Sequence, residues 1–210
     1  MTPQAALARG LRELDIDLPA RAREQLLAYV ALLAKWNRTY SLTAIRDPLA
    51  MVRQHLLDSL SVLPHLPMPD AGRLADVGSG AGLPGIPLAI ARPTWHVALA
   101  ESSEKKSAFL RQAAIELALA NVEVHAGRVE TWRPATLFSV VISRAFAALA
   151  AFASACAHLL APHGALAAMK GALARDELEG LGGWDCSVLA LRVPLVDAER
   201  HLVLCRAQRD

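Results

Sequence analysis

The chain has 210 residues, of which 54% are hydrophobic and 20% charged, and its net charge is +2. This composition excludes intrinsic disorder, and a chain of this length buries a sizeable core. No apolar stretch is long enough for a transmembrane helix, and the N-terminus lacks the apolar region of a signal peptide. We therefore expect a cytoplasmic protein without a membrane partner.

The cysteine, histidine and arginine contents are informative about other classes of site. Cys156, Cys186 and Cys205 are an odd number of cysteines in or beside apolar runs, so buried reduced thiols are predicted rather than a disulfide framework. The histidines and cysteines lack the spacing of zinc ligands, and no metal site is predicted. The 18 arginines against 4 lysines suit contacts with phosphate, but this excess alone leaves the partner open.

The first third of the chain shows only helical patterns. Helices are predicted over Pro3–Leu14, Pro19–Lys35 and residues 47–63. The polar segment 36–41 ends the second of these, and Asp47-Pro48 is typical of the start of the third. Three prolines between Pro64 and Pro69 predict a linker. We therefore expect an N-terminal helical region, residues 1–69, followed by a second region, residues 70–210, the two forming one compact unit.

From residue 70 on, short apolar runs alternate with helical patterns. Buried parallel strands are predicted at Arg73–Val77, His96–Ala100, Val122–His125, Leu137–Ile142 and Ala165–Met169. Helices are predicted between and after them at Ile86–Ala91, Glu104–Leu119, Leu149–Leu160 and Ala172–Leu181. Two further extended runs, Ser187–Val193 and His201–Arg206, are expected to pair antiparallel. The repeated strand–helix units predict an α/β fold with a doubly wound, mostly parallel sheet of seven strands.

A glycine-rich segment follows the first predicted strand. Four glycines lie within Gly78–Gly85, directly after Asp76 and Val77. Glycine lets the backbone turn sharply and approach a ligand without a Cβ in the way. Ligands of open α/β sheets bind beyond the carboxyl ends of the strands. The segment therefore predicts a ligand site that includes Gly78 and Gly80.

Charge complementarity narrows the choice of ligand. The sequence GAGLPG over Gly80–Gly85 formally matches a dinucleotide fingerprint, so an NAD(P)-dependent oxidoreductase is an alternative. Asp76 argues against a pyrophosphate, which prefers helix N-terminal amides without a nearby anion. S-Adenosylmethionine has a net positive charge, and Asp76, Glu101 after the second strand and Glu130 after the third form an acidic ring that suits it. The residues therefore favour the methyl donor.

Several motifs resemble those of one enzyme family. They are Asp76–Pro87 (DVGSGAGLPGIP), Ser143–Phe146 (SRAF), Met169–Gly171 (MKG), Lys35–Asn37 (KWN), His55–Ser59 (HLLDS) and Glu199–Val203 (ERHLV). Together they resemble the bacterial small-subunit ribosomal RNA guanine-N7 methyltransferases, also called glucose-inhibited division protein B. The resemblance covers essentially the whole chain. Ser41, where the family usually has Asn, and Glu101, where Asp is common, are departures that keep the chemistry.

The resemblance implies a Rossmann-like class I S-adenosylmethionine-dependent methyltransferase. The expected reaction is methylation of N7 of guanosine 527 in the 530 loop of 16S ribosomal RNA. The expected partner is this RNA in the small ribosomal subunit or an assembly intermediate, and the expected state is a monomer. The family's donor-binding positions correspond to Gly78, Leu83, Val129, Glu130 and Arg144.

The chemistry of guanine N7 limits what the protein must supply. N7 carries an in-plane lone pair and no proton, so attack on the sulfonium methyl requires alignment and electrostatics rather than a general base. We therefore predict no catalytic base, and Arg144 and Lys170, at the ends of the fourth and fifth strands, are candidate positioning residues. The candidate RNA-binding residues are Arg46, Arg53, Arg144, Phe146 and Lys170. A non-enzymatic RNA- or ribosome-binding protein is the remaining alternative.

Overall fold

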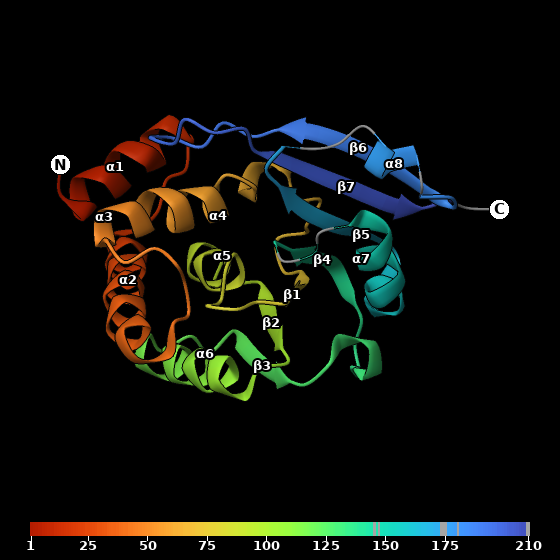
Figure 1. Ribbon diagram of the computed structural model, residues 1–210, viewed down its shortest axis with the longest axis horizontal. Helices are drawn as coiled ribbons and strands as arrows, with labels where there is room; N and C mark the ends of the chain where they lie inside the picture. Colours follow the sequence, from red (N-terminus) through yellow and green to blue (C-terminus); the bar gives the residue numbers. More distant parts are fainter. Residues whose placement is uncertain (145, 147, 173–175, 180, 209–210) are drawn as a thin grey trace.

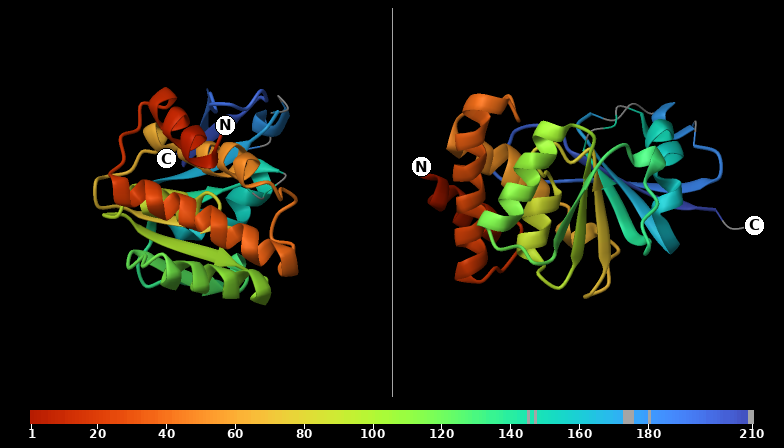
Figure 2. Two further views of the ribbon diagram at one scale, coloured as in Figure 1. Left: turned by 90° about the vertical axis from the view of Figure 1, so that its left-hand side faces the viewer. Right: turned by 90° about the horizontal axis from the view of Figure 1, so that it is seen from below.

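The computed structural model describes residues 1–144, 146, 148–172, 176–179 and 181–208. Its centre is one sheet with helices on both faces (Figures 1 and 2). The strands are β1 (Arg73–Val77), β2 (His96–Glu101), β3 (Val122–Ala126), β4 (Phe138–Ser143), β5 (Leu160–Lys170), β6 (Trp184–Ala190) and β7 (His201–Ala207). Their order in the sheet is β3-β2-β1-β4-β5-β7-β6.

The first five strands are parallel, and β7 runs antiparallel to both β5 and β6. The prediction of a mostly parallel seven-stranded sheet is therefore confirmed over the described residues. The chain order reverses between β1 and β4, which are neighbours in the sheet. A crevice at such a switch point is where open α/β sheets bind ligands.

The helices largely follow the predicted pattern. They are α1 (Pro3–Glu13), α2 (Ala20–Tyr40), α3 (Pro48–Met51), α4 (Asp58–Leu60), α5 (Gly85–Ala91), α6 (Glu104–Glu116), α7 (Leu149–Cys156) and α8 (Asp176–Glu179). A π-helix, Val52–Leu57, joins α3 to α4 without a break. Asp47 caps α3 as predicted, because its Oδ2 accepts a hydrogen bond from the Ala50 N–H at 2.8 Å. Parts of the predicted helix 172–181 (residues 173–175 and 180) lie outside the described residues.

The predicted end of the second helix at Lys35 is wrong, because α2 continues to Tyr40. One polar residue there, Asn37, has partners that sequence spacing does not indicate. The Asn37 side chain is buried, donates to the Ile45 carbonyl at 3.2 Å and accepts from the Thr43 N–H at 2.9 Å. The helix ends where Ser41 adopts a left-handed conformation with φ 51°.

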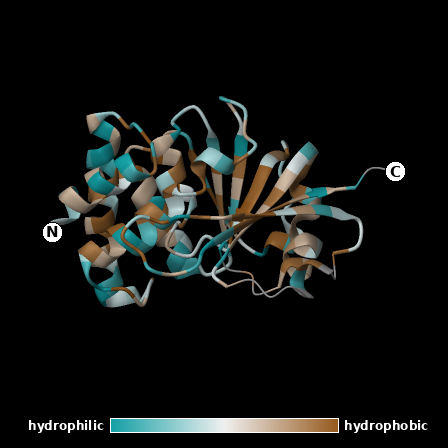
Figure 3. Ribbon diagram, turned by 90° about the horizontal axis from the view of Figure 1, so that it is seen from above, coloured by the Kyte–Doolittle hydropathy of each residue, from teal (hydrophilic) through white to brown (hydrophobic). Residues whose placement is uncertain are grey.

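Two apolar layers fill the space on either side of the sheet. The helices α1 to α6 pack on one face, against side chains such as Leu74, Leu99 and Ile142. The opposite face packs against α7 and α8 through side chains that include Val141 and Leu166. Figure 3 shows the strands as a hydrophobic centre between these layers. The N-terminal helices thus share their core with the sheet. No helix among the described residues is both long and apolar enough to cross a bilayer.

The prediction of reduced thiols is wrong for two of the three cysteines. Cys186 on β6 lies directly opposite Cys205 on β7, with 4.1 Å between the Cα atoms, and the two form a disulfide. The sequence places them 19 residues apart and does not show this register. Cys156 is a free, buried thiol as predicted, and burial raises its pKa to about 12.

Candidate functional site

The segment after β1 forms a tight glycine loop, residues 78–85, at the switch point. Gly80 adopts a left-handed backbone with φ 61°, and a Cβ there would meet nothing nearer than the Gly78 carbonyl at 3.8 Å. A Cβ at Gly85 would instead clash with the Leu99 side chain and lie 2.8 Å from Asp76 Oδ2. Gly85 is therefore required for packing, whereas Gly80 borders open space.

Asp76, at the end of β1, is fully buried beneath this loop. Its Oδ2 accepts hydrogen bonds from the Ser79 hydroxyl at 2.7 Å and the Gly85 N–H at 2.9 Å. Its Oδ1 has no hydrogen-bond partner among the described residues. Burial raises the pKa of Asp76 to about 6. One oxygen thus organises the glycine loop, while the other retains its capacity to accept a hydrogen bond.

Glu101, at the end of β2, is also buried and contacts the same loop. Its Oε2 accepts a hydrogen bond from the Gly80 N–H, and its Oε1 accepts one from the Ser103 N–H, both at 2.8 Å. Ser103 precedes α6, so this carboxylate connects the glycine loop to the start of that helix.

A cavity of about 210 Å³, the glycine-loop cavity, is lined by chain neighbours of these carboxylates, Val77, Ala100 and Ser102, but not by the carboxylates themselves. It is lined by Val77, Gly78, Ala100, Ser102, Gly127, Arg128, Val129, Glu130 and Phe146. The structure thus brings together the predicted donor-binding residues Gly78, Val129 and Glu130. Phe146, predicted to stack on an RNA base, lines this same cavity, with its ring 5.2 Å from that of Phe152.

A second cavity of about 300 Å³, the basic cavity, lies at the ends of β4 and β5. It is lined by Ile45, Gln54, His55, Asp58, Arg144, Met169, Lys170, Gly171, Leu191, Arg200 and His201. Both predicted positioning residues, Arg144 and Lys170, lie here. Arg144 Nη1 is 3.1 Å from Asp58 Oδ2, and Lys170 Nζ is 2.7 Å from Glu177 Oε2. Arg144, predicted to bind the donor as well as the RNA, thus lines the basic cavity and not the glycine-loop cavity. Phe146, two residues later, lines the glycine-loop cavity.

Arg144 and Lys170 are the only predicted site residues in this lining, and three further side chains there, His55, Asp58 and Arg200, set its charge and hydrogen bonding. His55 and Asp58 belong to the HLLDS motif and Arg200 to the ERHLV motif, so the family resemblance was the available signal. Asp58 pairs with Arg200 Nε at 2.9 Å as well as with Arg144. The buried His55 ring bonds to the Thr43 hydroxyl at 2.9 Å and to the Gln54 carbonyl at 3.1 Å. Burial and the nearby Arg144 lower the pKa of His55 to about 4.

Six predicted site residues line neither cavity: Asp76, Gly80 and Glu101, described above, and Leu83, Arg46 and Arg53. Arg46 is exposed and Arg53 half-buried, although their neighbours Ile45 and Gln54 do line the basic cavity. Leu83 is buried within the glycine loop and packs into the core.

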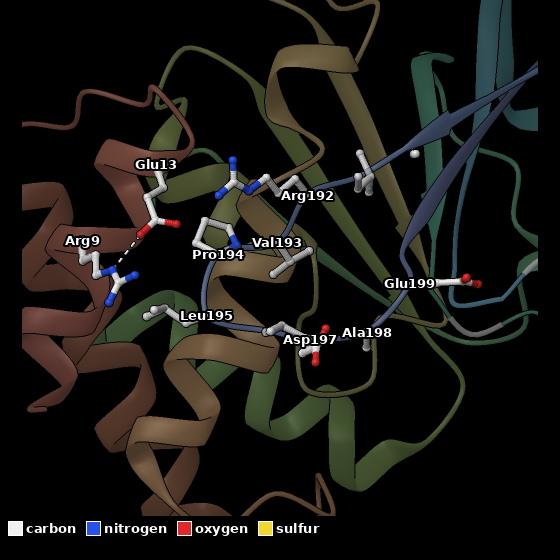
Figure 4. A pocket seen from close by; sticks show the side chains of 12 residues that line it. Arg9, Glu13, Arg192, Val193, Pro194, Leu195, Asp197, Ala198 and Glu199 are labelled. Atoms are coloured by element: carbon white, nitrogen blue, oxygen red, sulfur yellow. Dashed lines mark hydrogen bonds and ion pairs between the residues drawn. The ribbon is translucent and has the colours of Figure 1, made fainter.

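A larger hollow of about 880 Å³ lies between α1 and the segment that joins β6 to β7 and shares Leu191 with the basic cavity (Figure 4). Its charged groups include the Arg9–Glu13 ion pair, with 2.7 Å between Nε and Oε1. None of the predicted site residues lines it. The volume of this hollow alone therefore does not indicate a catalytic or binding site.

Comparison with known proteins places the chain in a family. The family model described as rRNA small subunit methyltransferase G matches residues 22–203. The chain belongs to this family. A ribosomal RNA small subunit methyltransferase G from Methylobacillus flagellatus is 51% identical over 206 residues, covering 98% of this chain and 99% of the relative. One from Burkholderia thailandensis is 52% identical over 209 residues, covering 96% and 90%.

Solved structures with lower identity share the fold. The precorrin-6y C5,15-methyltransferase of Geobacter metallireducens aligns with a TM-score of 0.56 at 15% identity, covering 81% of this chain and 92% of that one. The tRNA (m1A58) methyltransferase of Aquifex aeolicus aligns with a TM-score of 0.58 at 14% identity, covering 73% and 69%. The predicted class I methyltransferase fold is confirmed, and membership of this methyltransferase family decides against the oxidoreductase and the non-enzymatic alternatives.

Proposed function

We propose that this member of the family transfers a methyl group from S-adenosylmethionine to N7 of guanosine 527 in the 530 loop of 16S ribosomal RNA. The observation that carries this proposal is the pair of cavities on either side of the segment after β4. One is lined by Gly78 of the glycine loop together with residues at the ends of β2 and β3, and the other contains three basic side chains, Arg144, Lys170 and Arg200. A donor and an RNA nucleotide would thus meet at the carboxyl ends of neighbouring strands.

The residues present fit S-adenosylmethionine, which supplies an electrophilic methyl on its sulfonium. The space beside Gly80 would be filled by a side chain, and Asp76 Oδ1 is buried without a partner among the described residues. A ligand of net positive charge suits a buried carboxylate. We assign the donor to Asp76, Gly78, Gly80, Val129 and Glu130, with Glu101 holding the loop. One similar fold, at 18% identity and a TM-score of 0.55, is titled as a complex of DhpI with SAH.

The basic cavity suits the RNA. Arginine donates paired hydrogen bonds to phosphate, and the cavity contains Arg144 and Arg200. N7 attack requires no proton transfer, so these residues orient the nucleotide and no residue acts as a base. In A-form RNA N7 lies in a deep, narrow groove, so the target guanosine is unpaired or splayed out. Arg46 and Arg53 are assigned to flanking RNA backbone.

The small net charge of +2 bears on the form of the substrate. Few phosphate contacts give weak, salt-dependent binding to free RNA. We therefore propose that the substrate is the small subunit or an assembly intermediate. We also propose that the enzyme acts as a monomer.

Transfer of tritium from labelled S-adenosylmethionine to ribosomal RNA tests the activity. The parent protein is expected to label RNA, and a protein that binds RNA without transferring label contradicts the proposal.

The donor site has its own test in Gly80→Arg. A side chain at Gly80 would occupy the open space next to Gly78, which lines the glycine-loop cavity, so calorimetric titration is expected to show at least ~100-fold weaker binding of the donor, or about 2.7 kcal/mol. Gly183→Arg is the matched control, because Gly183 also has a left-handed backbone, φ 82°, and a Cβ there has no neighbour within 4 Å. Equal donor affinity in the two variants would contradict the placement of the site.

A further inference from the structure

Three segments far apart in the sequence meet at the carboxylate of Asp58. Asp58 begins α4, Arg144 follows β4, and Arg200 precedes β7. Arg144 Nη1 lies 3.1 Å from Oδ2, and Arg200 Nε lies 2.9 Å from Oδ1. The Asp58 side chain is only 4% exposed. Each carboxylate oxygen is therefore committed to one guanidinium.

The arginines remain accessible although their common partner is buried. Their side chains are 29% and 28% exposed, and both line the basic cavity. Arg144 Nη1 also lies 3.5 Å from the Gln54 carbonyl, and Arg200 Nη1 donates to the Glu199 carbonyl at 2.8 Å. The Nη2 group of each has no acceptor within the described part of the chain. Asp58 thus holds one side of each guanidinium and leaves donors on both for an anion.

An unusual helical turn precedes Asp58 in the chain. Residues 52–57 form a π-helix, a wide turn that is rare in proteins and frequent at functional sites. Asp58 follows it directly, and His55 within it lines the same cavity. The other titratable groups of the cavity are Lys170, paired with Glu177, and the His201 ring, bonded to the Gly171 carbonyl. With His55 uncharged, the two arginines outnumber the carboxylate between them.

We propose that Asp58 is a positioning residue for the RNA substrate: it aligns Arg144 and Arg200 so that both donate to one phosphodiester beside the target guanosine. This inference rests on the function proposed above. A phosphodiester fits because its two non-bridging oxygens accept paired hydrogen bonds from planar guanidinium groups. Asp58 itself, as an anion, does not contact the phosphate.

The variant Asp58→Asn separates this positioning role from a purely electrostatic one, because the two roles predict opposite changes in the affinity for RNA. Removal of one negative charge makes the cavity more basic, so charge alone predicts tighter RNA binding. Loss of alignment predicts weaker binding. In methyl transfer to small subunits we expect the KM for the subunits to rise about tenfold, with kcat changed by less than about threefold. Calorimetry is expected to give a donor Kd within about twofold of the parent value, since Asp58 does not line the glycine-loop cavity.

Glu13→Gln is the matched control. It removes the same charge from the Arg9–Glu13 ion pair, which lines neither the glycine-loop cavity nor the basic cavity, and is expected to leave the KM unchanged. A second variant, Arg200→Lys, keeps the positive charge but has no second donor edge, and is expected to raise the KM several-fold. Asp58→Glu keeps the negative charge, and its KM is expected to lie between those of the parent and Asp58→Asn.

Several results would overturn the inference. An unchanged or lower KM in Asp58→Asn would do so. A KM of Arg200→Lys equal to that of the parent would do so as well. Equal losses of donor affinity and RNA affinity, with a lower melting temperature, would show that Asp58 is merely structural. If the parent protein transfers no methyl group to RNA, the proposed function itself fails. If the parent is active and Asp58→Asn keeps its KM, only the inference about Asp58 fails.

Discussion

At the scale of single residues, two buried carboxylates hold the glycine loop in shape. Asp76 accepts hydrogen bonds from Ser79 and Gly85, and Glu101 accepts one from Gly80. Charge-assisted hydrogen bonds of this kind are among the stronger ones in proteins. We therefore expect both carboxylates to influence donor binding through the shape of the loop as well as through their charge.

Glu101→Ala is expected to weaken donor binding by about 1–3 kcal/mol, the usual cost of losing hydrogen bonds to a charged group. The loss has a structural reason, because the Gly80 N–H would be left without its acceptor. Calorimetric titration of the donor measures the effect. Glu116→Ala is the control, since the Glu116 carboxylate is exposed and accepts its hydrogen bond from Gln112. Donor binding as tight as in the parent would show that Glu101 does not support the loop.

Asp76 gives the protein a predicted dependence of stability on pH. Burial raises its pKa from 3.8 to about 6, so between these values the folded state binds the proton more tightly than the unfolded chain. The contribution of Asp76 to folding is thus largest at low pH and is lost as the pH rises through about 6. Relative to Asp76→Asn, which cannot titrate, the unfolding free energy of the parent should fall by about 2 kcal/mol from about pH 4.5 to 7.5. Urea unfolding at several pH values measures this, and parallel profiles would contradict it.

At the scale of elements, α2 contacts the glycine loop directly. The buried Tyr29 hydroxyl donates to the Ala81 carbonyl at 2.7 Å. Tyr29→Phe removes this hydrogen bond, and the Ala81 carbonyl loses its side-chain donor. We therefore expect the unfolding free energy to fall by about 1 kcal/mol. Urea unfolding of Tyr29→Phe and of Tyr40→Phe makes the comparison, because Tyr40 is 46% exposed and is expected to show little effect. Equal stability of the two variants would mean that the contact contributes nothing.

The elements also show how far the sequence alone predicts the structure. The parallel strands and the glycine loop depend on local apolar runs and on closely spaced glycines, so the sequence predicts them well. The pairing of Cys186 with Cys205 and the Asn37 hydrogen bonds depend on contacts between separate segments, which no local pattern indicates. The role of Asp58 is hidden for the same reason, since its partners lie 86 and 142 residues away.

At the scale of the whole molecule, the N-terminal helices and the sheet depend on one another. One apolar core joins side chains such as Leu33 and Leu57 to Leu74 and Ile142 of the sheet. The basic cavity likewise combines His55 and Asp58 with residues that follow β4 and β5. We therefore propose that residues 1–69 and 70–210 fold as one unit and that the RNA site forms only when both are present.

The most direct test of the account is to map the methyl group. Ribosomal RNA from a strain that lacks the enzyme would be treated with the purified protein and S-adenosylmethionine, as free RNA, as small subunits and as whole ribosomes. N7-methylguanosine would then be located by borohydride–aniline cleavage. We predict cleavage at guanosine 527 in the 530 loop, with small subunits or their assembly intermediates as the better substrates. Label found only on transfer RNA, on protein or at an adenine would contradict the proposed function.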